Sequence, residues 1–221
     1  MHIILASGSR HKAREIASLL APHTVQAYSD LIAPFEIVEN GATFAENALI
    51  KARAVFTAIS DRATAHDHAA DHNHTTLRDH AATHDPSPFV LADDSGICVD
   101  LLGGAPAIFS ARYAGAGASD GENLQKLIDA VKAQGASSSG AHYTAAIALV
   151  CGAGEFVSHG WLYGEAITTP RGTNGFGYDP IFVPNGFDQT LGELPDAIKA
   201  SISHRAEATR NMKIQLSVLI R

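Results

Sequence analysis

Short apolar runs alternate with amphipathic stretches through the first half of the chain. Residues 3–6 form an apolar run that is typical of a strand, and a turn of small residues follows them. Beyond this turn, Ile16, Leu19 and Leu20 recur at the spacing of one helix face. The pattern therefore predicts a strand, a tight turn and a helix, with Thr24–Ala27 as a candidate second strand.

The sequence indicates where two further helices begin. Thr43 with Glu46, and Ser119 with Glu122, fit the S/T-x-x-E/Q capping box, which satisfies free backbone amides of a first helical turn. Apolar residues then recur at helical spacing, namely Ala48, Ala52, Val55, Phe56 and Ile59 in the first helix and Leu124, Leu127, Ile128 and Val131 in the second. Each helix is therefore expected to bury one face.

Strand patterns dominate the second half of the chain. The expected elements are an apolar run at 89–92 that ends in Asp93-Asp94-Ser95-Gly96, a strand or turn at 97–102, paired strands at 143–150 and 155–162, a short strand at 181–183 and a helix at 203–220. Residues 135–140 are expected to be a flexible linker, and residues 174–180 a Gly-rich loop. This order of elements favours an α/β fold with a mixed central sheet.

Residues 60–88 differ in composition from the rest of the chain. They hold six of the 12 histidines and five aspartates, and large apolar side chains are almost absent. Such a segment cannot bury enough apolar surface to offset the entropy of ordering it. We expect a flexible insertion within a single domain that spans residues 1–221.

Composition and charge narrow the classes of function. The chain has 221 residues, of which 46% are hydrophobic and 18% charged, so it can build a sizeable core. Its formal charge of −7 argues against a general nucleic-acid-binding surface. Cys98 and Cys151 lie in apolar runs and are expected to be buried, reduced thiols. Neither a signal peptide nor an apolar run of membrane-spanning length is recognisable, so a cytoplasmic protein without membrane contact is expected.

The turn at residues 7–12 could bind an anion. A small-residue turn between a strand and a helix exposes backbone amides at the positive end of the helix dipole, which suits a phosphate. Lys12 would add a mobile positive charge one turn into the helix. The spacing of a Walker A loop is missing, and an ordinary strand–helix connection is the alternative.

The second candidate is the acidic pair Asp93–Asp94 at the expected strand end. Ligands of α/β sheets bind at such ends, and two adjacent carboxylates are costly there unless a cation compensates them. Mg²⁺ shared with substrate phosphates would do so, whereas a solvated turn is the alternative. Glu39, Lys51 and Lys199 would not stand out alone, and His204-Arg205 at a helix start could equally be solvated charge.

Taken together, these motifs resemble the inosine triphosphate pyrophosphatase family, which hydrolyses non-canonical purine nucleoside triphosphates. The matching stretches are Ser7-Gly8-Ser9-Arg10-His11-Lys12, Glu39-Asn40-Gly41-Ala42-Thr43-Phe44, Glu46-Asn47-Ala48, Lys51-Ala52-Arg53, Ala92-Asp93-Asp94-Ser95-Gly96, Gly103-Gly104-Ala105-Pro106, Ser110-Ala111-Arg112-Tyr113-Ala114-Gly115, Asn174-Gly175-Phe176-Gly177-Tyr178-Asp179-Pro180 and Lys199 to Ser203-His204-Arg205. They cover nearly the whole chain except the His-rich insertion.

The resemblance implies an elongated, two-lobed α/β fold with a nucleotide cleft between the lobes, usually as a homodimer, and cleavage of XTP, ITP or dITP to the monophosphate and pyrophosphate. It implies that Glu39, Asp93 and Asp94 surround Mg²⁺, with Asp94 as the proton acceptor for the attacking water. The implied substrate contacts are Ser7, Gly8, Ser9, Arg10, His11, Lys12 and Lys51 at the triphosphate, Ser95, and Phe176, Gly177, Tyr178, Asp179, Lys199, His204 and Arg205 at the base and its surroundings.

Two departures from the family pattern bear on these expectations. The family's first motif is usually Thr-Gly-Asn-x-x-Lys, and Ser9 here replaces the Asn with a shorter side chain. The second departure is the insertion, which is expected to bulge from the surface. Selection for a 6-keto purine needs a buried donor that adenine's amino group would leave unpaired, and Lys199, His204 and Arg205 are the candidate donors.

Three rival interpretations remain open from the sequence. A Maf-type nucleotide pyrophosphatase shares something of the Ser7-Gly8-Ser9 opening, but the FGYDP and SHR stretches argue against it. A metal-binding protein could use the closely spaced histidines of the insertion for Zn²⁺ or Ni²⁺. A nucleotide-binding protein without catalysis is the third, and the intact set of Lys12, Lys51, Asp93 and Asp94 argues against it.

Overall fold

The computed structural model describes residues 1–7, 10–70 and 87–219. Six strands form one sheet in the order β2-β1-β3-β4-β5-β6. The strands are β1 (His2–Leu5), β2 (Thr24–Ala27), β3 (Phe89–Val99), β4 (Ser138–Cys151), β5 (Gly154–Ile167) and β6 (Phe182–Pro184). β1 pairs in parallel with β2 and β3, whereas β3, β4, β5 and β6 pair antiparallel. The predicted mixed α/β sheet is thereby confirmed.

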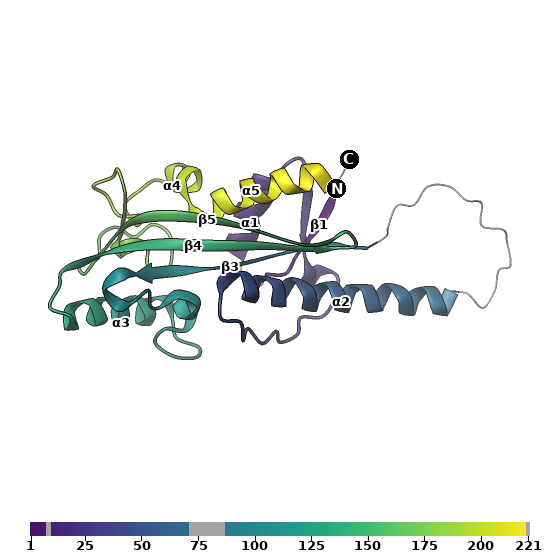
Figure 1. Ribbon diagram of the computed structural model, residues 1–221, viewed down its shortest axis with the longest axis horizontal. Coiled ribbons are helices and arrows are strands. Elements are labelled where there is room, and N and C mark those ends of the chain that lie inside the picture. Colours follow the sequence, from purple (N-terminus) through teal and green to yellow (C-terminus); the bar gives the residue numbers. More distant parts are fainter. Residues whose placement is uncertain (8–9, 71–86, 220–221) are drawn as a thin grey trace.

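The molecule is elongated because β4 and β5 form one long hairpin (Figure 1). Around one end of the hairpin lie β1, β2 and the helices that cover them, and around the other lie β6, further helices and the Gly-rich loop. The α-helices are α1 (Arg10–Leu20), α2 (Phe44–Ala70), α3 (Asp120–Ala133), α4 (Asp196–Ile202) and α5 (His204–Leu219). Short 3-10 turns occur at Tyr28–Asp30, Asp100–Leu102, Ala107–Arg112 and Asp179–Ile181.

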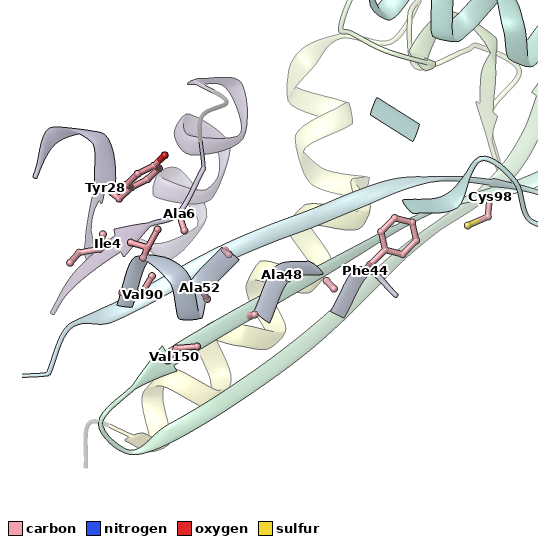
Figure 2. Packing of buried hydrophobic residues seen from close by; sticks show 13 residues of the cluster. Ile4, Ala6, Tyr28, Phe44, Ala48, Ala52, Val90, Cys98 and Val150 are labelled. Carbon is pink, nitrogen blue, oxygen red and sulfur yellow. The ribbon is translucent and has the colours of Figure 1, made fainter. Parts of the chain in front are cut away.

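Helix α2 covers one face of the sheet. Its buried residues Phe44, Ala48 and Ala52 pack against even-numbered β3 positions such as Val90, and against Val150 of β4 (Figure 2). The small alanines let the helix lie close to the strands. The capping box predicted at its start is present in part, because the Thr43 hydroxyl accepts a hydrogen bond from the Glu46 amide at 3.1 Å. This packing brings the first two turns of α2 over the middle of β3.

Helices α1 and α5 cover the opposite face. Ile16 of α1 and Met212 of α5 are fully buried against odd-numbered positions such as Leu5 and Leu91. A third cluster at the far end of the hairpin joins α3 to β6 and includes Leu127 and Phe182. The alternation of buried faces along β3 therefore assigns consecutive residues to different helices.

Four elements differ from the sequence predictions. β3 does not end at residue 92, because Asp93 to Val99 continue to pair with β4. β4 begins at Ser138, inside the expected linker, since the sheet ladder overrides the local preference of Gly and Ser. α4 is an additional helix that the sequence did not predict, whereas the predicted C-terminal helix is observed as α5. α2 runs to Ala70 and so includes residues 60–70 of the expected insertion, because extending a nucleated, Ala-rich helix costs little. Residues 71–86 of that insertion lie outside the described residues.

The helices of the described ranges give no candidate for a membrane crossing, since none is both long and apolar enough.

Candidate active site

The site forms where β1 ends. β1 pairs with β3 from Ile3 opposite Phe89 to Leu5 opposite Leu91, and the Ala6 amide still donates to the Leu91 carbonyl at 2.8 Å. The chain then leaves β3 to enter α1. β3 continues beyond β1, and among the described residues this edge has no strand partner at Asp93–Ser95, before Ser110 and Ala105 bond to Ile97 and Val99. The site therefore lies at the carboxyl end of β1. The prediction that Asp93 and Asp94 follow the end of their own strand is wrong, because both lie in the middle of β3.

Asp93 and Asp94 point to opposite faces of the sheet, as successive strand residues do. The Asp93 carboxylate lies 2.7 Å from Lys12 Nζ of α1 and 3.4 Å from Arg205 Nε of α5. The Asp94 carboxylate instead lies 2.9 Å from Lys51 Nζ of α2. The two adjacent acids thus do not meet at one point but lie in two separate sites, Asp93 beside Lys12 and Arg205 and Asp94 beside Lys51.

On the α2 face, Lys51 bridges two carboxylates. Its Nζ donates to Asp94 at 2.9 Å and to Glu39 at 3.0 Å. Burial lowers the pKa of Lys51, but the charges of Asp94 and Glu39 outweigh burial and raise it overall. Burial raises the pKa of Asp94, and the nearby Glu39 charge adds to that rise. The pKa of Lys51 is therefore raised by two acids, whereas the pKa of Asp94 is raised mainly by burial.

The loop that carries Glu39 is held by the start of α2. The Gly41 amide donates to Asn47 Oδ1 at 2.9 Å, and the Ala42 amide donates to Glu46 Oε2 at 2.6 Å. Gly41 is required here because a Cβ at this position would collide with Glu46 and Asn47. The glutamate of the capping box therefore anchors the Glu39 loop beside Lys51.

On the α1–α5 face, Asp93 is surrounded by cations. Its side chain is 0% exposed. Burial raises its pKa, but Lys12 and Arg205 outweigh burial and hold the pKa well below its ordinary value. Arg205 is itself buried, and it donates to Glu15 Oε2 at 2.8 Å and to Ser95 Oγ at 3.0 Å. The two negative charges of Asp93 and Glu15 therefore face the two positive charges of Lys12 and Arg205.

The Gly-rich loop and α4 meet beside Arg205. Lys199 Nζ donates to Asp179 Oδ2 at 2.7 Å, and the Phe176 amide donates to the same oxygen at 3.2 Å. Gly175 has a φ of +85°, and a Cβ there would collide with Asp179 and Lys199. The loop is thereby fixed with the Phe176 ring 49% exposed.

Aromatic and polar contacts tie the same loop to the rest of the fold. The Tyr178 hydroxyl donates to the Ser110 carbonyl at 2.7 Å, and the Gly177 amide donates to Asp120 at 3.1 Å. The His204 ring stacks on Tyr143 with centroids 4.8 Å apart. Burial lowers the pKa of His204 well below its ordinary value, so its imidazole is neutral at pH 7.

Three adjoining hollows connect these groups. One is lined by Ser7, Lys12, Glu39, Lys51 and Asp93 together with Ala6, Tyr28, Phe35 and Ile37. The second shares Lys12 with the first and is lined further by Ser95, Tyr143, Phe176, Tyr178, His204 and Arg205 among others. The third adds Glu15, Lys199 and Ser203 behind Phe176. An elongated ligand with an anionic end and a planar end would fit this succession.

Most of the expected substrate residues lie in or beside these hollows. The hollows are lined by Ser7, Lys12, Lys51, Ser95, Phe176, Gly177, Tyr178, Asp179, Lys199, His204 and Arg205. Arg10 and His11 form the first turn of α1. Gly8 and Ser9 lie outside the described residues.

The three expected metal ligands are not brought together as one set. Within residues 1–7, 10–70 and 87–219, no three His, Cys, Asp or Glu side chains are grouped so that they could hold a metal ion. Glu39 and Asp94 share Lys51, whereas Asp93 turns to Lys12 and Arg205. Strand alternation is the physical reason, because Asp93 and Asp94 cannot point the same way in β3.

Sequence reasoning missed Glu15, Tyr143 and Asp120. Glu15 lies three residues after Lys12 and therefore on the same face of α1, which was the available signal. Tyr143 was assigned to an apolar strand, and Asp120 follows the Ser119 cap. The roles of Tyr143 and Asp120 depend on contacts with His204 and Gly177, which are distant in sequence, so no local pattern indicates these two residues.

Comparison with known proteins gives a consistent result. The sequence profile described as Ham1 family matches residues 3–215. A protein of Sulfurimonas denitrificans named dITP/XTP pyrophosphatase is 52% identical over 219 residues, covering 99% of this chain and 100% of that protein. One of Nautilia profundicola with the same name is 46% identical over 216 residues, covering 98% and 97%.

Solved structures agree with the sequence comparison. The Ham1 protein of Staphylococcus aureus superposes with a TM-score of 0.79 at 30% identity, covering 99% of this chain and 100% of that chain. The nucleoside-triphosphatase, or dITP/XTP pyrophosphatase, of Mycobacterium abscessus gives 0.67 at 33% identity, covering 96% and 98%. The similarity therefore extends over the whole chain.

Proposed function

Since the chain belongs to the Ham1 family, we propose that it hydrolyses XTP, ITP and dITP to the monophosphate and pyrophosphate. The observation that carries the proposal is the Lys51 bridge, with Nζ 3.0 Å from Glu39 and 2.9 Å from Asp94. A lysine between two acids, beside Lys12 and an exposed aromatic ring, supports the binding of a triphosphate and a planar base.

Asp94 is the proposed proton acceptor for the attacking water. It needs to be within hydrogen-bond reach of that water, and general-base assistance of this kind contributes about 10²–10⁴-fold to a rate. Lys51 keeps Asp94 oriented through a charge-assisted hydrogen bond. Lys12 and Lys51 would neutralise the negative charge that develops as pyrophosphate leaves.

We propose that the reaction depends on a metal ion and that this ion is Mg²⁺. Asp94 and Glu39 carry two negative charges against the single positive charge of Lys51. Within the described part of the chain, the buried Asp94 Oδ2 has no hydrogen-bond partner. Carboxylate oxygens are the ligands that Mg²⁺ prefers, so this pair fits the ion. When bound, Mg²⁺ would supply Lewis-acid neutralisation of the phosphate oxygens.

The base is proposed to lie against Phe176. Its half-exposed ring offers a face for stacking, and Tyr178, Lys199, His204 and Arg205 surround it. Asp179 holds the Lys199 ammonium and the Tyr143 ring stacks on His204, so both side chains are oriented. The ammonium is a donor, and the neutral imidazole carries one N–H donor. A 6-keto group would accept from such donors, whereas the amino group of adenine would leave them unpaired.

A substrate panel tests the proposal. We expect rapid release of pyrophosphate from XTP, ITP and dITP in the presence of Mg²⁺, and little from ATP, whose amino group would leave the donors unpaired. UTP and TTP belong in the panel, because faster turnover of these would favour a Maf-type activity instead, which the family match does not support. Release of single phosphates in place of pyrophosphate would contradict the proposed bond cleavage.

A homodimer is the proposed state in solution. It follows from the resemblance to inosine triphosphate pyrophosphatases, and light scattering coupled to gel filtration measures it directly. A mass near 23.2 kDa, that of one chain, would contradict the proposal.

A further inference from the structure

The two acids of the β3 pair differ in what already surrounds them. Asp93 and Glu15 face Lys12 and Arg205, so two negative charges meet two positive charges. Asp94 and Glu39 both contact the Lys51 ammonium, so two carboxylates share one contacting cation, and Lys12 acts on Asp94 only from a longer distance. A divalent cation is attracted to the second group, and in the first group it would have to approach two existing cations.

We propose that Asp93 is a positioning residue that holds Lys12 and Arg205 in place, and not a ligand of the metal. The proposal rests on the proposed function of the same site. It deepens that function by assigning the two neighbouring acids to different tasks.

Position supports this assignment. Lys12 comes from α1 and lines the hollow beside Glu39 and Lys51, whereas Arg205 comes from α5 and lines the hollows around Phe176. Asp93 touches both cations through the same oxygen, Oδ2, at 2.7 Å and 3.4 Å. One buried carboxylate therefore fixes a cation of the triphosphate end relative to a cation of the base end.

Neighbouring groups reinforce the link. Ser95 Oγ donates to Asp93 Oδ2 at 3.4 Å and accepts from Arg205 at 3.0 Å. Glu15 holds the other side of the guanidinium at 2.8 Å and also accepts from Ser203 Oγ at 2.8 Å. Arg205 is thus gripped from two sides, while Lys12 has Asp93 as its carboxylate.

A metal role for Asp93 is the competing interpretation. Its second oxygen, Oδ1, has no hydrogen-bond partner among the described residues, as is also true of Asp94 Oδ2. Asp93 also borders the hollow that Glu39 and Lys51 line. The two roles differ in what a neutral residue would change, because a lost ligand weakens metal binding and a lost counter-ion weakens substrate binding.

The experiment compares Asp93→Asn with Glu15→Gln and Glu39→Gln. Asp93→Asn keeps the shape of the side chain but leaves the buried Arg205 and the partly buried Lys12 without their shared acid. We expect the KM for ITP and XTP to rise about ten-fold or more, since removing one partner of a buried charge pair is costly. The Mg²⁺ concentration for half-maximal activity, and the Kd for Mn²⁺ measured by calorimetry, should stay at the wild-type values.

The two companion variants separate the halves of the link. Glu15→Gln loosens Arg205 and the neighbouring Ser203 but keeps the Asp93–Lys12 pair, so it should lower the ratio of ITP to ATP hydrolysis and leave Mn²⁺ binding unchanged. Glu39→Gln should instead weaken Mn²⁺ binding. If Asp93→Asn weakens Mn²⁺ binding as much as Glu39→Gln does, or leaves KM unchanged, the proposal is overturned.

Two further outcomes are distinguishable. If the wild-type protein cleaves none of the nucleotides, the proposed function is wrong. Mn²⁺ binding still decides whether Asp93 is a ligand of the metal ion. If circular dichroism shows Asp93→Asn to be unfolded, the double variant Asp93→Asn/Lys12→Met removes one cation with the acid and should fold. Loss of Mn²⁺ binding in that folded double variant would also overturn the proposal.

Discussion

Asp93 and Asp94 are chemically identical, adjacent in sequence and both buried, yet they lie in opposite electrostatic surroundings. Lys12 and Arg205 hold the pKa of Asp93 well below its ordinary value, whereas burial raises the pKa of Asp94 despite Lys51. The alternation of β3 causes the difference, because it turns one acid toward α1 and α5 and the other toward α2. An acid whose negative charge is balanced by neighbouring cations holds those cations in place. An acid whose charge is only partly balanced is available to bind a metal ion or to accept a proton.

The largest expected effect is on turnover by Asp94→Asn. Amide for carboxylate keeps the size of the side chain but removes the proton acceptor, so we expect kcat for ITP to fall about 10³-fold. Steady-state rates with saturating Mg²⁺ measure it, and circular dichroism checks that the fold is retained. Near-normal ITP hydrolysis by this variant would refute the assignment of Asp94.

Much of this comparison was within reach of the sequence. The strand before Asp93, the capped helix with Lys51 and the turn before Lys12 follow from periodicity and capping patterns. The predicted end of β3 at residue 92 is wrong, because pairing with β4 continues the strand through the polar residues to Val99. Had the strand been extended, alternation alone would have separated the two acids.

Other features of the site were beyond any local pattern. Glu15 and Arg205 meet across 190 positions of sequence, and Ser95 and Arg205 across 110. Such contacts depend on α5 packing beside α1 on one face of the sheet. Family resemblance could assign Arg205 to the substrate site, but it carried no information on which acids hold it.

The second largest effect is expected on stability, from Asp93→Asn. Removing one partner of a buried ion pair leaves uncompensated charge, and we expect a loss of about 3–5 kcal/mol in the free energy of unfolding at pH 7. Urea unfolding followed by fluorescence of Trp161 measures it. A loss as small as that of a surface substitution would show that the Asp93 ion pairs add little to stability.

The pH dependence of this loss has a definite sign. The folded pKa of Asp93 lies below its ordinary value of 3.8, so its charge stabilises the folded state above that pH. The contribution declines as the pH falls below 3.8 toward the folded pKa. The stability gap between the wild type and Asp93→Asn should therefore be widest at neutral pH and narrow as the solution is acidified.

Asp94→Asn should change stability in the opposite direction and by less. Burial raises the folded pKa of Asp94, so ionisation of this group opposes folding as the pH rises above 3.8. A neutral residue removes that cost, and we expect a gain of about 0.5–2 kcal/mol at pH 7 without Mg²⁺, as is common for functional residues. The same urea titration measures it, and a clear loss of stability would mean that the Lys51–Asp94 bond outweighs the burial of the charge.

The smallest effect is expected from an ion pair outside the site, and it tests whether burial is what distinguishes Asp93. Arg53 donates to both oxygens of Glu155 at 2.7 Å and 2.6 Å, which is better geometry than the Asp93–Arg205 contact. The two side chains are 52% and 41% exposed, however, so water already solvates both charges.

We expect Arg53→Gln to lower the free energy of unfolding by about 0.2–1 kcal/mol. Salt should shrink this cost further, because exposed charges are screened and buried ones much less. Urea unfolding at low and high salt, beside Asp93→Asn, gives the comparison. Equal losses for the two variants would mean that hydrogen-bond geometry, and not burial, sets the strength of both pairs.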